Sequence, residues 1–462
     1  MAKPLKEVCI GLDWGTHSSK WWFAAIEDSG RLLSPKTPGA VLDSTIYRTG
    51  ETLKLVRERT VSDSEIQDPR VKRFLLQDPQ GASFWDAPRE GIGISLGDAA
   101  TLSLSVLLGD AVSRLKKQEL QIGRETKVSI VYSLPNWIGS DPKHQAARRR
   151  MFQTTVVLAG VLGRLGFDRL PGVNEKVNLQ EWANSLREIR AAEHSRQQFQ
   201  RAPQDFATLV EHEFVSPTSE GLSWRLAPES SAAGFPQLLR LLMPVEEAKK
   251  TQDHWVKLLV VDVGAGSTDA GYFISSRRAT GTLLLNYLKP APTQDYAGEQ
   301  LTEMLKSFYF HKKHREITTQ EAETIKLSAP GEWVNEKFAK TWRTEIAEHV
   351  GDYMLHVPDE LRLGQPVIPG LKIVMTGGSG LVDGLAKAIR DAVIEALLNR
   401  GIAGNVANRT EVSELLLDWP EDRVDRARRA VSVGAGDSTF GQLRYREGLE
   451  AAAPGPGRLE RW

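Results

Sequence analysis

Apolar residues along the chain gather in short runs, and two of these runs end in the same way. Val8 to Ser19 (VCIGLDWGTHSS) and Leu258 to Asp269 (LLVVDVGAGSTD) each pass from apolar residues to an aspartate and then to glycines and hydroxyl side chains. Apolar runs of this length that end at glycine are typical of buried β-strands. Because the two segments lie far apart in the chain, they indicate an internal duplication rather than a short repeat. We therefore expect two similar lobes.

The pattern around these segments predicts a mixture of strands and helices. Lys20 to Ile26 predicts a second strand, and Glu27 to Gly30 predicts a hairpin turn after it, so an antiparallel strand pair is expected there. Val128 to Tyr132 predicts another buried strand, and Asp141-Pro142 then begins a predicted helix that extends to Gly160. Leu371 to Leu381 (LKIVMTGGSGL) predicts a further strand that ends in a glycine turn and leads into a helix. The expected fold class is α/β.

Composition narrows the classes of partner and compartment. The chain has 59 Lys and Arg residues and 59 Asp and Glu residues, so no net charge attracts it to nucleic acid or to a membrane surface. Its apolar runs are shorter than the roughly 20 residues that a membrane helix needs, and the N-terminus has no secretory signal. The single cysteine, Cys9, lies in an apolar run and is expected to be a core thiol. We expect a soluble cytoplasmic protein with no membrane or nucleic-acid partner.

The two duplicated turns carry residues that suit phosphate chemistry. An aspartate at the end of a strand, followed by glycine and hydroxyl residues, places a carboxylate beside backbone N–H groups that can cradle phosphates. A carboxylate repels phosphate, so a bridging cation is required, and Mg²⁺ suits oxygen ligands and retained water. Asp13 and Asp262 are the candidate Mg²⁺ residues. The candidate phosphate-binding residues are Gly15, Thr16, His17 and Ser18 in the first turn, and Gly264, Gly266, Ser267, Thr268 and Asp269 in the second.

Together with Thr376-Gly377-Gly378-Ser379, these turns resemble the first phosphate, second phosphate and adenosine signatures of one superfamily. It contains actin, hexokinase and other sugar kinases, and the seventy-kilodalton heat-shock chaperones of the DnaK type. Ser133 to Trp137, Ala227 to Ala233 and Ala430 to Gly436 are similar to segments of the chaperone branch. The resemblance extends from Val8 to about Gly441. It implies two actin-like, ribonuclease H-like lobes around a nucleotide cleft, with helical insertions.

The same resemblance implies roles for further residues. Gly298 and Glu299 are similar to the family's Gly-Gly-Glu segment, and Glu323 and Lys326 would hold the ribose and adenine. Gly377, Gly378 and Ser379 would lie against the adenosine. Glu229 and Lys72 correspond to the family's catalytic glutamate and lysine, with Glu229 displaced by one position relative to Pro228. His17 replaces the usual hydroxyl, and a neutral imidazole donates only one hydrogen bond.

The implied activity is Mg²⁺-dependent binding of ATP and ADP with slow ATP hydrolysis. Asp262 or Glu229 would orient the attacking water, and Lys72 would stabilise the transition state. Hydrolysis would act as a timer for lobe closure, and thereby for the affinity of a protein partner. Three alternatives remain open: an actin-like filament, a small-molecule kinase, and a nucleotide-binding module without turnover.

The resemblance also predicts a domain arrangement. We expect a first lobe over 1–250, a second over 251–424, a helix over 425–445 that returns to the first lobe, and a disordered tail over 446–462. No room follows Gly441 for the chaperones' substrate-binding half, so a client would be recognised through a separate protein. The polar segment from Val177 to Glu213, an expected helical insertion, and the basic run Arg148 to Arg150 are the candidate docking surfaces. An oligomer is compatible with the sequence.

Overall fold

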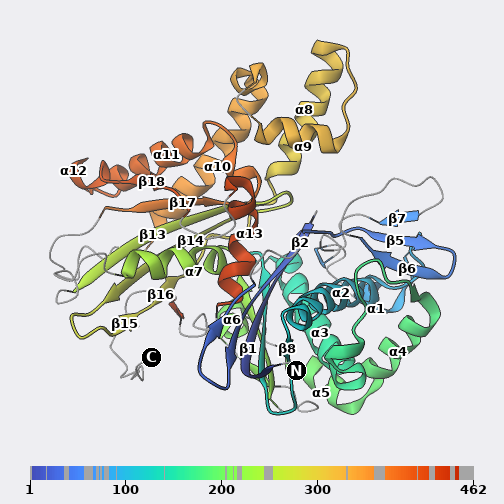
Figure 1. Ribbon diagram of the computed structural model, residues 1–462. Coiled ribbons are helices and arrows are strands. Elements are labelled where there is room, and N and C mark those ends of the chain that lie inside the picture. Colours follow the sequence, from blue (N-terminus) through green and yellow to red (C-terminus); the bar gives the residue numbers. More distant parts are fainter. Residues whose placement is uncertain are drawn as a thin grey trace. The chain divides into compact units, whose positions relative to one another are not determined.

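The computed structural model shows a mixed α/β protein whose chain forms two compact units (Figure 1). Unit 1 comprises Met1–Pro228 and Ala435–Ser438, and unit 2 comprises Glu229–Gly434 and Thr439–Trp462. The structure describes residues 3–16, 18–35, 41–56, 66–68, 72, 75–76, 83–89, 91–139, 141–202, 205–211, 213–215, 221–243, 253–328, 331–357, 370–402, 404–415, 422–437 and 443–446.

The main sheet of unit 1 is built around its first strand. β1 (Lys3–Trp14) pairs antiparallel with β2 (Ser18–Glu27) and parallel with β9 (Lys127–Leu134). β12 (Leu222–Pro228) lies parallel to β9 on its outer side. The short strands of the same sheet are β3 (Leu32–Leu33), β4 (Leu42–Asp43), β8 (Leu120–Gln121) and β11 (Phe214–Val215).

Two long helices pack on this sheet. α2 (Leu96–Lys117) is capped by the Ser95 hydroxyl, and α3 (Pro142–Leu165) begins with proline after the cap residue Asp141. α2 is long and apolar enough to cross a membrane, and our expectation that no such segment exists was wrong on this point. However, 83% of its apolar window is buried inside the protein, which is the environment of a core helix. A single helix of this kind is weak evidence for a membrane.

Two of the three arginines of the basic run on α3 are buried, and only Arg149 is exposed. Arg148 and Arg150 are each 3% exposed, and their guanidinium groups donate to the backbone oxygens of Trp137 and Leu75. The expectation of a docking surface there was wrong for these two residues, because they fix neighbouring loops to the helix.

A second, smaller sheet and several helices complete unit 1. The sheet has the order β10-β6-β5-β7, and three helices lie in the described part of the segment expected to be a helical insertion. These elements are β5 (Ile46–Thr49), β6 (Thr52–Leu55), β7 (Ile66–Asp68), α1 (Ser83–Asp86), β10 (Val177–Asn178), α4 (Leu179–Ala191), α5 (Glu193–Gln200) and α6 (Phe206–Glu211).

Unit 2 has its own sheet, again built around its first strand. β13 (His254–Val263) pairs antiparallel with β14 (Thr268–Arg277) and parallel with β17 (Lys372–Thr376). β16 (Asn286–Leu288) lies beside β14, and β18 (Glu411–Ser413) lies parallel to β17. The remaining strands are β15 (Leu283–Leu284) and β19 (Arg444–Arg446).

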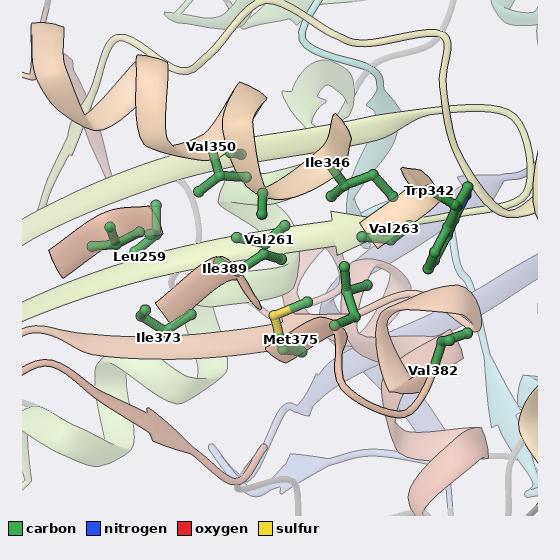
Figure 2. Close-up of a cluster of buried hydrophobic side chains, with 14 of the residues drawn as sticks. Leu259, Val261, Val263, Trp342, Ile346, Val350, Ile373, Met375, Val382 and Ile389 are labelled. Carbon is green, nitrogen blue, oxygen red and sulfur yellow. The ribbon is translucent and has the colours of Figure 1, made fainter. Parts of the chain in front are cut away.

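Alternation along β13 divides the core of unit 2 between two faces. Leu259, Val261 and Val263 point to the face covered by α10 (Lys337–His356) and α11 (Leu385–Asn399), as Figure 2 shows. Val260 faces α7 (Glu229–Leu242), where Gly234 allows the helix to come close. The other helices of unit 2 are α8 (Gly298–Lys313), α9 (Thr319–Leu327), α12 (Gly404–Ala407) and α13 (Arg423–Ala435).

The main sheets of the two units have the same topology. In each, the first strand pairs antiparallel with the second, the third lies antiparallel beside the second, and the fourth and fifth lie parallel on the other side. The five strands are β1, β2, β3, β9 and β12 in unit 1, and β13, β14, β16, β17 and β18 in unit 2. This shared order agrees with the duplicated strand and turn in the sequence.

The boundaries of the units differ from those expected from the sequence. The contacts assign α7, which begins at Glu229, to unit 2, whereas the sequence analysis set the boundary near residue 250. Packing of α7 against β13 and β14 is the physical reason. α13 belongs to unit 2 as far as Gly434. The expected disordered tail, apart from Arg446, lies outside the described residues.

Candidate phosphate-binding loops

The first candidate loop joins β1 to β2 in unit 1. A Cβ atom at Gly15 would overlap the backbone oxygen of Ser18, so the close turn requires glycine. The Ser44 hydroxyl donates to the Gly15 oxygen at 2.8 Å and holds the turn from outside. Thr16 and Ser18 are half-exposed, as a phosphate-binding role requires. His17 lies outside the described residues.

Asp13 stands at the end of β1, directly opposite Lys20 on β2. Nζ of Lys20 lies 3.2 Å from Oδ2 of Asp13, and the Ser133 hydroxyl lies 3.4 Å from Oδ1 and donates to it. Asp13 and Lys20 are 5% and 8% exposed, so this is a nearly buried ion pair. Sequence reasoning missed Lys20. The signal was its place in the strand after the turn, where antiparallel pairing brings it beside Asp13.

The second candidate loop joins β13 to β14 in unit 2. The N–H of Gly264 donates to the Ser267 oxygen at 2.9 Å, which closes the turn. α8 begins against this turn, because the N–H of Gly298 donates to the Gly264 oxygen at 3.0 Å and that of Glu299 to Ala265 at 2.8 Å. All four residues of the turn, 264–267, are half-exposed.

Asp262 precedes this turn at the end of β13. The Thr376 hydroxyl, at the end of the parallel strand β17, donates to Oδ1 of Asp262 at 2.9 Å. Gly377 follows with φ of +75°, and a Cβ atom there would lie 2.7 Å from the same oxygen. The Asp262 carboxylate is therefore fixed by a hydroxyl and by a turn that has no space for a side chain.

The two aspartates occupy equivalent places. In each unit the carboxylate is the second-last residue of the first strand, and a hydroxyl within the last two residues of the parallel fourth strand donates to its Oδ1 atom. The residue opposite differs: Lys20 faces Asp13, whereas the fully buried Asp269 faces Asp262 and accepts from the Thr293 hydroxyl at 2.7 Å. In the first loop, Lys20 therefore neutralises the charge of Asp13, whereas in the second loop the residue opposite Asp262 is another carboxylate, Asp269.

The second loop's hydroxyls have different environments. Thr268 is fully buried, and its hydroxyl donates to the Tyr296 oxygen at 2.8 Å. A hydroxyl has one proton to donate, so Thr268 fixes the loop instead of facing a phosphate. The half-exposed Ser267 and the backbone of Gly266 are better placed for phosphate than Thr268.

Lys326 on α9 is buried with three acceptors around its ammonium group. Its Nζ donates to the Gly298 oxygen at 3.2 Å, to the Thr302 hydroxyl at 3.1 Å, and to Oε1 of Glu323 at 2.8 Å. Burial lowers the pKa of Lys326, and Glu323 opposes this shift. Because the three ammonium protons have protein acceptors, Lys326 supports the start of α8. The Glu323 side chain is 25% exposed and is the more accessible of the pair.

Unit 2 brings three of the expected segments together. A Cβ atom at Gly298 would overlap the Ser379 hydroxyl and would lie 2.8 Å from the Gly264 oxygen. Gly298 therefore lies between the second phosphate signature and the adenosine signature, which includes Gly378. The glycine allows these segments to meet.

Besides Asp262, the sequence predicts two catalytic residues, Glu229 and Lys72, and both are buried. Glu229 is the first residue of α7 and is 5% exposed, and Lys72 is 6% exposed. Within the described part of the chain, the hydrogen-bond partners of Asp13 are Lys20 and Ser133, and Lys72 is not among them. The catalytic roles of Glu229 and Lys72 stay predictions.

The residues present suit a hydrated cation better than a metal enclosed by protein. Among the described residues, no group of three or more His, Cys, Asp or Glu side chains could hold a metal ion. Mg²⁺ commonly keeps several waters and is bound by one or two carboxylates together with phosphate oxygens. A single fixed carboxylate such as Asp262 fits that mode of binding.

Comparisons with known proteins do not place the chain in a family. No protein-family model matches the chain, and a search of curated proteins finds no match.

Proposed function

We propose that this chain is a Mg²⁺-dependent ATP-binding protein with two actin-like lobes, and that it hydrolyses ATP slowly as a conformational switch. One observation carries the proposal: in both main sheets, an aspartate near the end of the first strand accepts a hydrogen bond from a hydroxyl near the end of the parallel fourth strand. A carboxylate beside a glycine turn suits the phosphates of a nucleotide, and each unit has such a turn.

Each loop has a distinct task in this proposal. Asp13 and Asp262 hold Mg²⁺ through water, and the cation neutralises charge on the phosphates. Lys20 keeps the Asp13 carboxylate oriented and adds positive charge to the first loop. Ser267 and the turn's backbone bind phosphate in unit 2, and Glu323 lies nearest the ribose.

Hydrolysis requires a water in line with the terminal phosphorus and a group that accepts its proton. Asp262 or Glu229 orients that water, and charge that develops on the phosphate oxygens is stabilised by a cation. Lys72 is the expected lysine for this role, and Lys20 is the lysine that the structure pairs with the first aspartate. Comparison of phosphate release by Lys20→Met and Lys72→Met, each beside the wild type, distinguishes the two.

The switch itself follows from the difference between ATP and ADP. The γ-phosphate offers contacts that ADP lacks, so ATP favours the state in which both loops bind it. A coupling of about 1 to 3 kcal/mol shifts partner affinity roughly 5- to 150-fold, and the partner shifts nucleotide affinity equally. The partner is a separate protein that recognises the client, in the manner of a chaperone.

One purified sample tests the proposal against its alternatives. ATP titration with phosphate-release kinetics should show slow turnover, and hydrogen exchange in saturating ATP and ADP should differ in both units. Identical exchange in the two nucleotides would leave a static binding module. Light scattering that rises with ATP would favour a filament, and phosphate transfer to an added sugar would favour a kinase.

A further inference from the structure

Arg428 lies on α13 against the glycine turn of unit 2. A Cβ atom at Gly378 would lie 3.3 Å from the Arg428 Nε atom, so the guanidinium group faces this turn closely. The N–H of Gly377 donates to the Ala427 oxygen at 3.0 Å, which ties the turn to α13 one residue before Arg428. The arginine and the turn are therefore held together by the backbone.

Arg428 has no acceptor of its own within the described part of the chain. It is half-buried there, without an ion pair or hydrogen bond. Lys326 is a second cation near Arg428. Burial lowers the pKa of Lys326, and the positive charge of Arg428 lowers it further, while Glu323 raises it. Glu323 is already bonded to Lys326. The Asp262 carboxylate also lies against this turn, since a Cβ atom at Gly377 would lie 2.7 Å from its Oδ1 atom, and that oxygen accepts a hydrogen bond from the Thr376 hydroxyl.

We propose that Arg428 and the Gly377–Gly378 turn form an anion-binding site whose ligand is a phosphate group. A guanidinium group presents a planar set of donors that matches two oxygens of one phosphate. A partly desolvated cation without an acceptor is unfavourable, and a bound anion removes that cost. Gly378 has no side chain to cover the guanidinium group. The site goes beyond the proposed ATPase, since it requires neither hydrolysis nor the first loop.

Free phosphate and a phosphorylated ligand share this chemistry, so both serve as probes. The test compares wild type, Arg428→Gln, Arg428→Lys and the matched control Arg423→Gln, which removes an exposed arginine from the start of the same helix. Calorimetry measures the affinity of each protein for inorganic phosphate, adenosine and ADP. Thermal unfolding without ligand measures the effect of each substitution on the fold.

We expect Arg428→Gln to weaken phosphate binding at least about tenfold, because a hydrogen bond to a charged group is lost. Arg428→Lys should retain part of the affinity, and Arg423→Gln should bind phosphate as the wild type does. If ADP binds at this site through its phosphates, its affinity should fall together with that of phosphate, while adenosine affinity stays unchanged. Without ligand, Arg428→Gln should unfold at or above the wild-type temperature, since an unpaired cation has been removed.

Several results would overturn the site. Equal phosphate affinity in wild type and Arg428→Gln would do so, as would the absence of phosphate and ADP binding to the wild type at about 10 mM. An equal loss of adenosine and ADP affinity would show that the guanidinium group stacks on a base instead. Lower stability of Arg428→Gln without ligand, with unchanged phosphate affinity, would show a structural role. Phosphate binding without ATP hydrolysis would sustain this site while contradicting the ATPase.

Discussion

The Thr376 hydroxyl donates a hydrogen bond of 2.9 Å to Oδ1 of Asp262, across the ends of two parallel strands. Ser133 has the same relationship to Asp13 in the other unit, at 3.4 Å. A carboxylate held in this way keeps one orientation toward the turn that follows it. The proposed function of the site depends on this preorganisation more than on any single phosphate contact.

Thr376→Val should therefore reduce function more than stability. Valine keeps the shape of threonine but removes the donor to Asp262, which costs about 1 kcal/mol of folding stability. We expect Mg²⁺-dependent ATP affinity or hydrolysis to fall roughly tenfold. Thr324→Val is the control, because that hydroxyl bonds to the Gln320 oxygen on the exposed side of α9. Equal nucleotide affinity and turnover in wild type and Thr376→Val would contradict the proposed orientation.

Lys20→Met should destabilise unit 1 because it leaves Asp13 nearly buried without its cation. Breaking such a pair from one side costs about 3 kcal/mol, as measured by chemical denaturation. The double variant Asp13→Asn with Lys20→Met should recover part of that loss, since no unpaired charge remains. Lys6→Met, at an exposed position of β1, should be neutral. If Lys20→Met and the double variant were equally unstable, the interaction between Asp13 and Lys20 would make no measurable contribution to stability.

Gly377→Ala should destabilise the protein by more than about 1 kcal/mol and impair nucleotide binding. Its φ is +75°, and the added Cβ would overlap the Val263 backbone oxygen. Gly281→Ala is a matched control, because Gly281 has φ of +85° but a Cβ atom added there would meet nothing within 4 Å. Thermal unfolding should show the larger loss for Gly377→Ala. Equal losses in Gly377→Ala and Gly281→Ala would show that the positive φ alone causes the destabilisation, without a contribution from overlap with Val263.

The buried thiol of Cys9 should make stability fall at alkaline pH. Burial raises the pKa of Cys9 from 9.0 to about 12, so the folded state favours the neutral thiol. This contribution is complete below pH 9 and is lost as pH rises toward 12, with a slope of up to about 1.4 kcal/mol per pH unit. The difference in stability between wild type and Cys9→Ala isolates it from other groups. A difference independent of pH would contradict the buried environment.

The strands and turns of both duplicated segments could be predicted from the sequence, because apolar runs followed by glycine have a local signature. Lys20 was missed as the partner of Asp13, because its place in the strand after the turn indicates the partner only once the register of the hairpin is known. The environment of Lys326 depends on Gly298 and Thr302, which are distant in sequence. Burial of Arg148 and Arg150 was missed because a run of arginines also suits an exposed helix. Tertiary contacts decided each of these cases.

The central claim is that fixed aspartates bind ATP through Mg²⁺, and calorimetry of ATP binding with and without Mg²⁺ tests it most directly. The wild type should bind ATP at least about tenfold more tightly with Mg²⁺ than with excess chelator. Asp262→Ala, folded by circular dichroism, should lose that Mg²⁺-dependent difference, and Asp13→Ala should weaken it. Absence of ATP binding to the wild type, or the same Mg²⁺ dependence in Asp262→Ala, would contradict the claim.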